Sequence, residues 1–352
     1  MQGTLRQRVV FLSRFSQFVR RQALARAPLR GTAIASLMVM SGCAGVQSAL
    51  DPSGAEAKQI ATLFWVMVAG GAAIWLAVIG MLLYAARWKG EPHSAHVAGQ
   101  LIVWGGAVFP AIILVALLGY ALWLMPSLRP QSAKPPVWPL RIEVTGEQFW
   151  WRVSYRAENR LGPIASANEI RLPLGQRVEF VLKSSDVIHS FWIPSLGGKM
   201  DMIPGRTNHL SLLATKAGMF RGPCTEFCGT SHALMAFSAV VMEPAAFDAW
   251  LEAQSQPAEE LTGDGRLRFV SNGCGSCHTV RGTEATGTLG PDLTHLGSRE
   301  TLAAGILPNT EEAIRRFIAE PDIIKPGSKM PSFRMLPEDD LQAIASYLKG
   351  LK

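Results

Sequence analysis

Five side chains with sulfur or imidazole donors stand at a spacing that favours metal binding. The set comprises His189, Cys224, Cys228, His232 and Met235. Thiolate and thioether donors with imidazole favour copper, or zinc where the thioether plays no part. Cysteines four residues apart are able to bridge two metal ions, each of which then takes one imidazole. This is the ligand set of a dinuclear, thiolate-bridged copper centre (CuA), which accepts and releases single electrons.

Other readings of the same loop stay open. A closed tetrahedral zinc site uses two cysteines and two histidines but gives Met235 no role. A Cys224–Cys228 disulfide is compatible with an oxidising compartment. A mononuclear blue-copper site needs a single cysteine, so the second cysteine argues against it. In the dinuclear reading, Met235 and the backbone carbonyl of Glu226 are weak axial donors.

A second redox motif lies near the C-terminus. Cys274-Gly275-Ser276-Cys277-His278 is the attachment signature for a covalent haem c, in which both thiols bond the porphyrin and the histidine ligates iron. Lys329-Met330-Pro331 resembles a loop of small class I cytochromes c, and Met330 is expected as the sixth ligand. Met335 is the rival ligand. A thioredoxin-like pair would need a βαβ setting that this helical tail lacks.

Composition and charge exclude some partner classes. The 352 residues allow two or three folded units. The formal charge is +7, and seven arginines precede residue 43 with no acid among them, which leaves the remainder near neutral (7 − 7 = 0). The basic balance therefore belongs to a leader and does not indicate a nucleic-acid partner.

The N-terminal third predicts a leader and a membrane anchor. Residues 1–42 read as a signal peptide of lipoprotein type, with Cys43 as the lipidated residue, or as an ordinary or uncleaved leader. Residues 43–128 read as a two-helix transmembrane hairpin, because 60–86 and 101–128 carry no charge. Arg87 and Lys89 lie in the connecting loop. The positive-inside tendency therefore predicts a bacterial inner membrane location with the later domains on the periplasmic side.

The remaining chain predicts a β domain, a linker and a helical domain. Residues 129–252 are rich in strand formers, which predicts a rigid β-sandwich to hold the metal loop. The strands are expected near 142–144, 178–182 and 237–242. The segment 253–262 reads as a linker, and 263–352 as an all-α cytochrome c domain.

The helices of the last domain have recognisable ends. Asn309 is expected to cap a helix that Pro321 terminates, with Glu312 as its reciprocal partner. Pro337 is expected to open the final helix. Leu341 and Ile344 are among the residues that share one face of that helix.

Three stretches of the chain resemble subunit II of the haem–copper cytochrome c oxidases. They are the loop Cys224–Met235, the segment Val187–Gly197 and the motif Asp201–Arg206. With the C-terminal motif, the chain resembles the caa-type oxidases. The resemblance implies a cupredoxin-like Greek-key sandwich, oxidase subunit I and other subunits as partners, and a soluble cytochrome c or similar electron donor.

The resemblance also implies roles for further residues. In the family a Q-W-x-W segment carries the incoming electron. In this chain Phe149 stands at the position of the first tryptophan. Trp150 and Trp151 are therefore expected to accept the electron; the alternative is that they are core aromatics. The Glu226 carboxylate is expected to reach a Mg²⁺ ion at the subunit I contact. Val103 stands where many members carry a glutamate at the mouth of a proton path, so the resemblance does not imply a proton role for this subunit.

The expected function is electron delivery within a proton-pumping terminal oxidase. Electrons would pass from a soluble donor through haem c and the dicopper centre to subunit I, where oxygen is reduced. The alternatives are the electron-accepting subunit of a nitric oxide or nitrous oxide reductase and a non-catalytic copper-binding protein. A copper-delivery role would leave the haem motif unexplained, and quinol oxidases lack the copper ligands.

Overall fold

The computed structural model describes residues 44–87, 94–128, 140–157, 162–259 and 263–352. The predicted leader 1–42 and Cys43 lie outside these residues, as do Lys89 and Glu91 of the loop after Arg87. The lipoprotein and orientation assignments therefore remain predictions. Residues Val46–Lys352 belong to one unit by their internal contacts.

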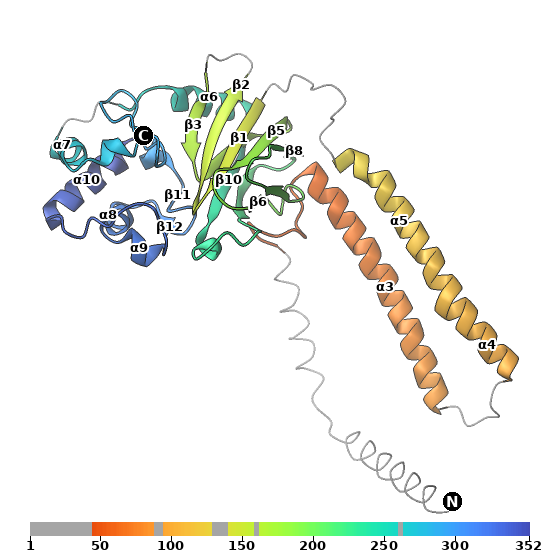
Figure 1. The fold of residues 1–352 in the computed structure, drawn as a ribbon. Helices are drawn as coiled ribbons and strands as arrows, with labels where there is room; N and C mark the ends of the chain where they lie inside the picture. Colours follow the sequence, from red (N-terminus) through yellow and green to blue (C-terminus); the bar gives the residue numbers. More distant parts are fainter. Residues whose placement is uncertain (1–43, 88–93, 129–139, 158–161, 260–262) are drawn as a thin grey trace, which may run out of the picture. The chain divides into compact units, whose positions relative to one another are not determined.

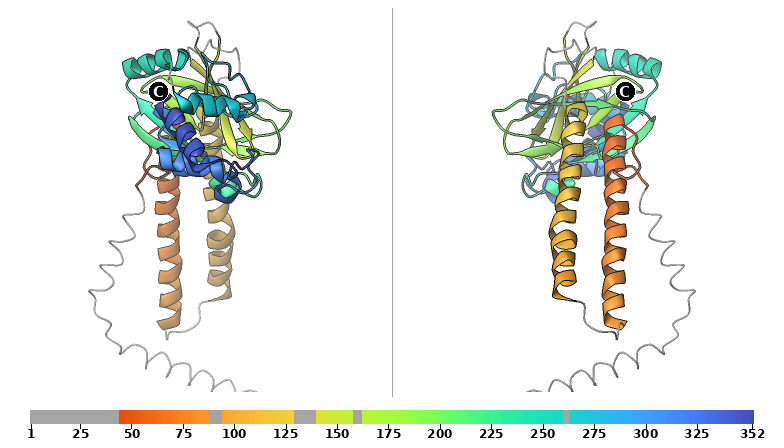
Figure 2. Two further views of the ribbon diagram at one scale, coloured as in Figure 1. Left: turned by 90° about the vertical axis from the view of Figure 1, so that its left-hand side faces the viewer. Right: turned by 90° about the vertical axis from the view of Figure 1, so that its right-hand side faces the viewer.

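Two apolar helical segments form the hairpin predicted near the N-terminus. The first is α3 (Ala55–Arg87), and the second consists of α4 (Ala95–Val103), η2 (Trp104–Val108) and α5 (Phe109–Leu128). The spans Ala55–Arg87 and Ala95–Pro126 have 33 and 32 residues, and neither apolar window is buried. At ~1.5 Å per residue each exceeds a hydrocarbon core of ~30 Å. Figures 1 and 2 show the two segments as an antiparallel pair.

A π-helical turn, η2, interrupts the second segment just before Pro110. Proline has no amide hydrogen to donate to the helical ladder. The amide of Phe109 bonds to the carbonyl of Trp104, one residue further back than in an α-helix. The turn thus lets the helix continue through the proline.

The larger sheet of the β domain has the strand order β3-β2-β1-β5-β8. Its central strand β1 pairs antiparallel with β2 and parallel with β5. Buried and half-buried residues alternate along β1, as the pattern at 142–144 predicts. The bounds are β1 Leu140–Glu147, β2 Trp150–Ala157, β3 Ile164–Ala167, β5 Arg177–Ser184 and β8 Asn208–Leu213.

A smaller sheet, of order β4-β10-β9, completes the predicted sandwich. Side chains from both sheets share one hydrophobic core. Within it the ring of Phe237 stacks on Phe191 at 4.9 Å and meets Trp151 edge-on at 5.3 Å. The bounds are β4 Glu169–Pro173, β9 Gly218–Pro223 and β10 Ala236–Met242, with the separate hairpin β6 His189–Phe191 and β7 Met200–Met202.

The C-terminal domain is mainly helical and has its own hydrophobic core. Leu341 and Ile344 of the last helix are buried there, as predicted. Its helices are α7 Asp264–Ser271, η4 Cys274–Ser276, η5 Leu296–Ser298, α8 Glu311–Ala319, α9 Pro321–Ile324 and α10 Glu338–Gly350, with a short hairpin of β11 Thr301–Leu302 and β12 Leu307–Pro308.

Two local expectations differ from the structure. The helix cap before α8 is Thr310, whose hydroxyl accepts from Ala313 N at 3.2 Å. Asn309 instead donates to the carbonyls of Leu296 and Arg299, so the predicted cap was wrong by one residue. The Asn309 side chain is thus used in hydrogen bonds to an earlier segment, and the next residue, Thr310, caps the helix instead.

The linker region is also more structured than the sequence suggests. Helix α6 (Pro244–Ser255) extends into the predicted linker 253–262. Arg281 of the C-terminal domain donates to the carbonyls of Gln254 at 2.6 Å and Ser255 at 2.9 Å. The start of this segment is therefore fastened to the domain that follows it.

Candidate metal centre and haem-attachment site

The loop between β9 and β10 carries both buried thiols. Cys224 follows the last residue of β9, and Met235 precedes the first residue of β10. The two strands pair antiparallel, and the Cys224 amide donates to the Met235 carbonyl at 2.8 Å. Because both ends of the loop are fixed to a sheet, its side chains are held at defined separations.

The upstream imidazole reaches this loop from β6. His189 is fully buried, and its Nδ1 lies 3.9 Å from Cys224 Sγ. The ring packs against Gly146 of β1, where a Cβ atom would lie 2.7 Å from the imidazole. Only glycine leaves room for the ring at that position.

The donor atoms form two sets, one around each sulfur. Cys224 Sγ lies near His189 and is 3.3 Å from the Glu226 carbonyl. Cys228 Sγ lies 3.6 Å from His232 Nδ1 and 3.8 Å from Met235 Sδ. Each thiol thus has its own imidazole and its own weak donor.

The separation of the sulfurs distinguishes the alternatives. The two Sγ atoms are 3.9 Å apart, far beyond the ~2.05 Å of a disulfide bond, and both thiols are free. The donor atoms of His189, Cys224 and Cys228 lie within 4.8 Å of one another. One tetrahedral zinc ion would leave the thioether and carbonyl idle, whereas two ions bridged by the sulfurs use every donor. The residues therefore fit a dinuclear copper group.

Titration of the two thiols is coupled by their proximity. The contact with Cys228, opposed by burial and aided by His189, lowers the pKa of Cys224 to about 4. The bond to Cys224 and burial raise the pKa of Cys228. Burial alone would lower the pKa of His189, but contacts with Cys224 and Asp186 outweigh it and raise the pKa. A cationic group is what such a buried cluster needs to hold both sulfurs as thiolates.

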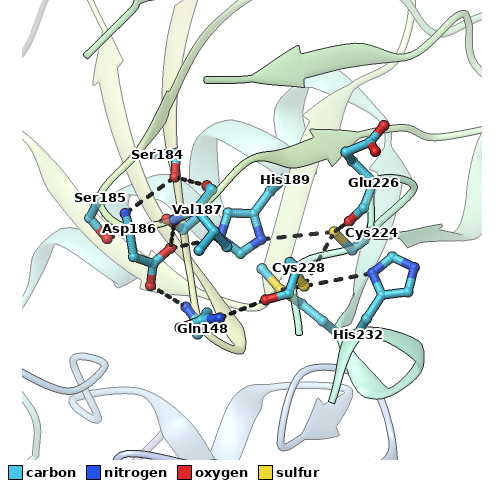
Figure 3. A network of polar contacts seen from close by, with 12 residues as sticks. Gln148, Ser184, Ser185, Asp186, Val187, His189, Cys224, Glu226, Cys228 and His232 are labelled. Atoms are coloured by element: carbon cyan, nitrogen blue, oxygen red, sulfur yellow. Dashed lines mark hydrogen bonds and ion pairs between the residues drawn. The ribbon is translucent and has the colours of Figure 1, made fainter. Parts of the chain in front are cut away.

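A second layer of polar groups orients the first imidazole (Figure 3). Asp186 Oδ1 lies 2.9 Å from His189 Nε2, which leaves Nδ1 directed at the sulfurs. Asp186 Oδ2 accepts from the Gln148 amide at 2.7 Å, and Gln148 Nε2 donates to the Cys228 carbonyl at 2.6 Å. Carboxylate–histidine pairs of this kind fix the ring and raise its basicity as a ligand.

Sequence reasoning missed both Asp186 and Gln148. The aspartate is three residues before His189, a spacing that allows contact within one turn. Burial alone would raise the pKa of its carboxyl, but hydrogen bonds from Gln148, His189 and Val187 outweigh burial and lower the pKa. An acid so close to a candidate ligand was the available signal for Asp186. Gln148 begins the segment that corresponds to Q-W-x-W, but only its aromatic residues were assigned a role.

The Cys274–His278 motif begins in a short 3-10 helix, and hydrogen bonds hold its histidine. Cys274 opens η4, and the His278 amide donates back to its carbonyl at 3.1 Å. Burial lowers the pKa of His278, and its Nδ1 lies 2.8 Å from the Pro291 carbonyl. A neutral ring that donates from Nδ1 keeps the Nε2 lone pair free for iron. Burial also raises the pKa of the Cys274 thiol to about 11.

Burial separates the two sixth-ligand residues. Met330 is partly buried against the core of the C-terminal domain. Met335 is 74% exposed. An axial thioether has to lie inside the domain, so the burial favours Met330.

The remaining predicted residues surround the copper loop. Trp151 is fully buried and its ring centroid lies 6.1 Å from that of His189. Trp150 is half-buried, with the Arg152 guanidinium 4.7 Å above its ring. The Glu226 carboxylate points away from the thiols and lies 3.8 Å from Lys199 Nζ.

Comparisons with known proteins agree with the arrangement of domains. The family described as "Cytochrome C oxidase subunit II, periplasmic domain" matches residues 156–243, and "Cytochrome c" matches 264–352. The chain is 35% identical to cytochrome c oxidase subunit 2 of Alkalihalophilus pseudofirmus over 339 residues, which cover 90% of this chain and 94% of that protein.

Two further similarities cover less of the chain. Cytochrome c oxidase subunit 2 of Bacillus subtilis is 37% identical over 228 residues, 60% of this chain and 62% of that protein. The solved periplasmic domain of subunit II of cytochrome oxidase (CoxB) of Bradyrhizobium japonicum is 33% identical, covering 34% of this chain and 96% of that one, with a TM-score of 0.31.

Proposed function

From the premise that the chain belongs to the cytochrome c oxidase subunit 2 family, we propose that it carries electrons to the oxygen-reducing subunit. The chain is a membrane-anchored subunit of a haem–copper oxidase complex and carries a cytochrome c domain. The proposed route runs from a soluble cytochrome c or similar donor to a covalent haem c, then to the dicopper centre and on to subunit I. Reduction of oxygen to water there is coupled to proton pumping.

When bound, the haem and the dicopper group each accept and release single electrons. Cys224 and Cys228 would hold the copper ions as thiolates, together with the Nδ1 atoms of His189 and His232. The observation that carries the proposal is the pairing of each sulfur with its own imidazole, at 3.9 Å and 3.6 Å. Burial of the thiols excludes water from the sulfurs.

The C-terminal domain would hold the haem through Cys274 and Cys277, with His278 and Met330 as the iron ligands. Pro291 fixes the tautomer of His278. Trp151, whose ring lies beside His189, is proposed to accept the incoming electron. Trp150, the half-buried first residue of β2, is proposed to do the same. The half-exposed Glu226 carboxylate is proposed to bind Mg²⁺ at the contact with subunit I.

Rapid mixing of the purified oxidase with reduced soluble cytochrome c tests this proposal. We expect the haem band of this subunit to appear first, followed by oxygen consumption and, in sealed vesicles, by acidification outside. A Cys274→Ala/Cys277→Ala variant should lose haem and oxidation of the donor, and Cys224→Ser should keep haem but block oxygen consumption. Undiminished oxygen consumption in the Cys224→Ser complex would refute the route.

A further inference from the structure

Residues Lys325–Lys329 precede the predicted haem ligand Met330 and lie against the copper-ligand loop. We propose that this segment, the docking segment, clamps the C-terminal domain permanently onto that loop. The chain's own haem domain then occupies the flank of the copper site, and external donors are limited to the haem. The inference rests on the proposed function and names the partner of the same site.

The burial of Lys325 is the first support. Its side chain is 3% exposed, and its Nζ donates to the Leu234 carbonyl at 2.9 Å and the Ala303 carbonyl at 2.8 Å. Leu234 belongs to the copper loop and Ala303 to the C-terminal domain. Lysine is almost never fully buried without partners. A domain that docked only transiently would expose this amine in each cycle and bury it again at a large desolvation cost.

A second contact joins the adjacent residue to the loop. Ser231 is fully buried, and its Oγ donates to the Pro326 carbonyl at 2.6 Å. Ser231 directly precedes the predicted ligand His232. The hydroxyl therefore ties the backbone of the docking segment to the backbone of a copper ligand.

Packing closes the same flank. A Cβ atom on Gly327 would lie 3.1 Å from the ring of Phe149, which is only 5% exposed. Gly327 has φ +79°, a conformation that favours glycine. Phe149 stands at the first tryptophan of the family's Q-W-x-W segment, so the docking segment covers that position. Lys329 Nζ adds a contact at 3.5 Å to Asp186, which orients His189.

One backbone amide reports directly on docking. The Ala236 amide, next to the predicted ligand Met235, donates to the Ala304 carbonyl of the C-terminal domain at 2.9 Å. This bond exists only while the domains are together. Its exchange with deuterated water therefore measures how often they separate.

Hydrogen exchange in the purified oxidase, loaded with copper and haem, tests the clamp. We expect slow exchange at Ala236 in the wild type. Exchange should be about tenfold faster, the equivalent of ~1.4 kcal/mol, in the Lys325→Met/Ser231→Ala variant. Ser238→Ala is the matched control, because Ser238 also faces the C-terminal domain, 3.4 Å from Thr301 Oγ1, but not through the docking segment. Exchange in the control should stay at the wild-type rate.

A second readout links docking to electron transfer. After flash photoreduction of the haem, its reoxidation by the copper site should be several-fold slower in Ser231→Ala, restored in Ser231→Thr and unaffected in Ser238→Ala. Rapid exchange of Ala236 in the wild type, unchanged exchange in Lys325→Met/Ser231→Ala, or unchanged reoxidation in Ser231→Ala overturns the clamp. A preparation without copper or haem would refute the proposed function instead, so the two failures are distinguishable.

Discussion

Replacing Asp186 with asparagine should weaken metal binding at a site that the residue itself does not touch. Its two carboxylate oxygens accept from Gln148 N at 2.7 Å, Val187 N at 2.8 Å and His189 Nε2 at 2.9 Å, and Lys329 Nζ lies 3.5 Å away. Asparagine has the same shape but only one acceptor oxygen. Its amide nitrogen must therefore face at least one of these donors.

The expected magnitude follows from that mismatch. A lost bond that leaves a buried donor unpaired costs ~1–3 kcal/mol. With Oδ1 kept on His189, the asparagine leaves the Gln148 amide unpaired; in the flipped orientation His189 loses its acceptor, and its ring is free to rotate or change tautomer. Removal of such an orienting partner typically lowers metal affinity by ~10–100-fold, or ~1.4–2.7 kcal/mol. The affinity of Asp186→Asn for copper should fall within that range.

Competition with a chromogenic copper chelator measures this affinity in the purified chain. Asp51→Asn is a suitable control, because Asp51 is a half-exposed carboxylate paired with Lys216 at 3.4 Å, outside the copper loop. The control should bind copper as the wild type does. If Asp186→Asn also bound copper with wild-type affinity, the orienting role of Asp186 would be wrong.

Three further perturbations have defined outcomes. Burial lowers the pKa of Lys325 to about 7, against ~10.4 in an unfolded chain. Between these two pH values the unfolded state binds more protons than the folded state, so the free energy of unfolding should rise with pH. Denaturation midpoints measured across this pH range should show the rise, and Lys325→Met should abolish it. Met330→Leu should remove the thioether–iron absorption band and lower the reduction potential of the haem. Met335→Leu, at a 74% exposed residue, should leave both unchanged. The reverse pattern would identify Met335 as the ligand. Ile344→Ala, at a 1% exposed core position, should destabilise the C-terminal domain by ~2–5 kcal/mol in chemical denaturation, and a loss below ~1 kcal/mol would contradict its place in the core.

Local patterns in the sequence predicted much of the architecture. Alternation at 142–144 and the apolar run at 237–242 correspond to β1 and β10, because one face of each strand packs on a shared core. The uncharged stretches correspond to the two long apolar helices. The spacing of Cys224, Cys228, His232 and Met235 predicted a common site because one short loop carries all four.

Contacts between distant segments could not be predicted in this way. Gln148 meets the Cys228 carbonyl across a sequence separation of 80 residues, and Lys325 meets Leu234 across 91. No local pattern encodes such pairs. The predicted helix cap was wrong for the same reason, since Asn309 donates to the carbonyls of Leu296 in η5 and of Arg299 just after it. Hydrogen bonds from Arg281 to Gln254 and Ser255 likewise hold the start of the predicted linker against the C-terminal domain.

The metal content of the purified subunit, together with its electron paramagnetic resonance spectrum, tests the dinuclear site most directly. We expect two copper ions and one covalent haem per chain, with an unpaired electron shared equally between the two copper nuclei. A single copper ion, a zinc ion, or a signal localised on one nucleus would contradict the assignment of Cys224 and Cys228 as bridging ligands.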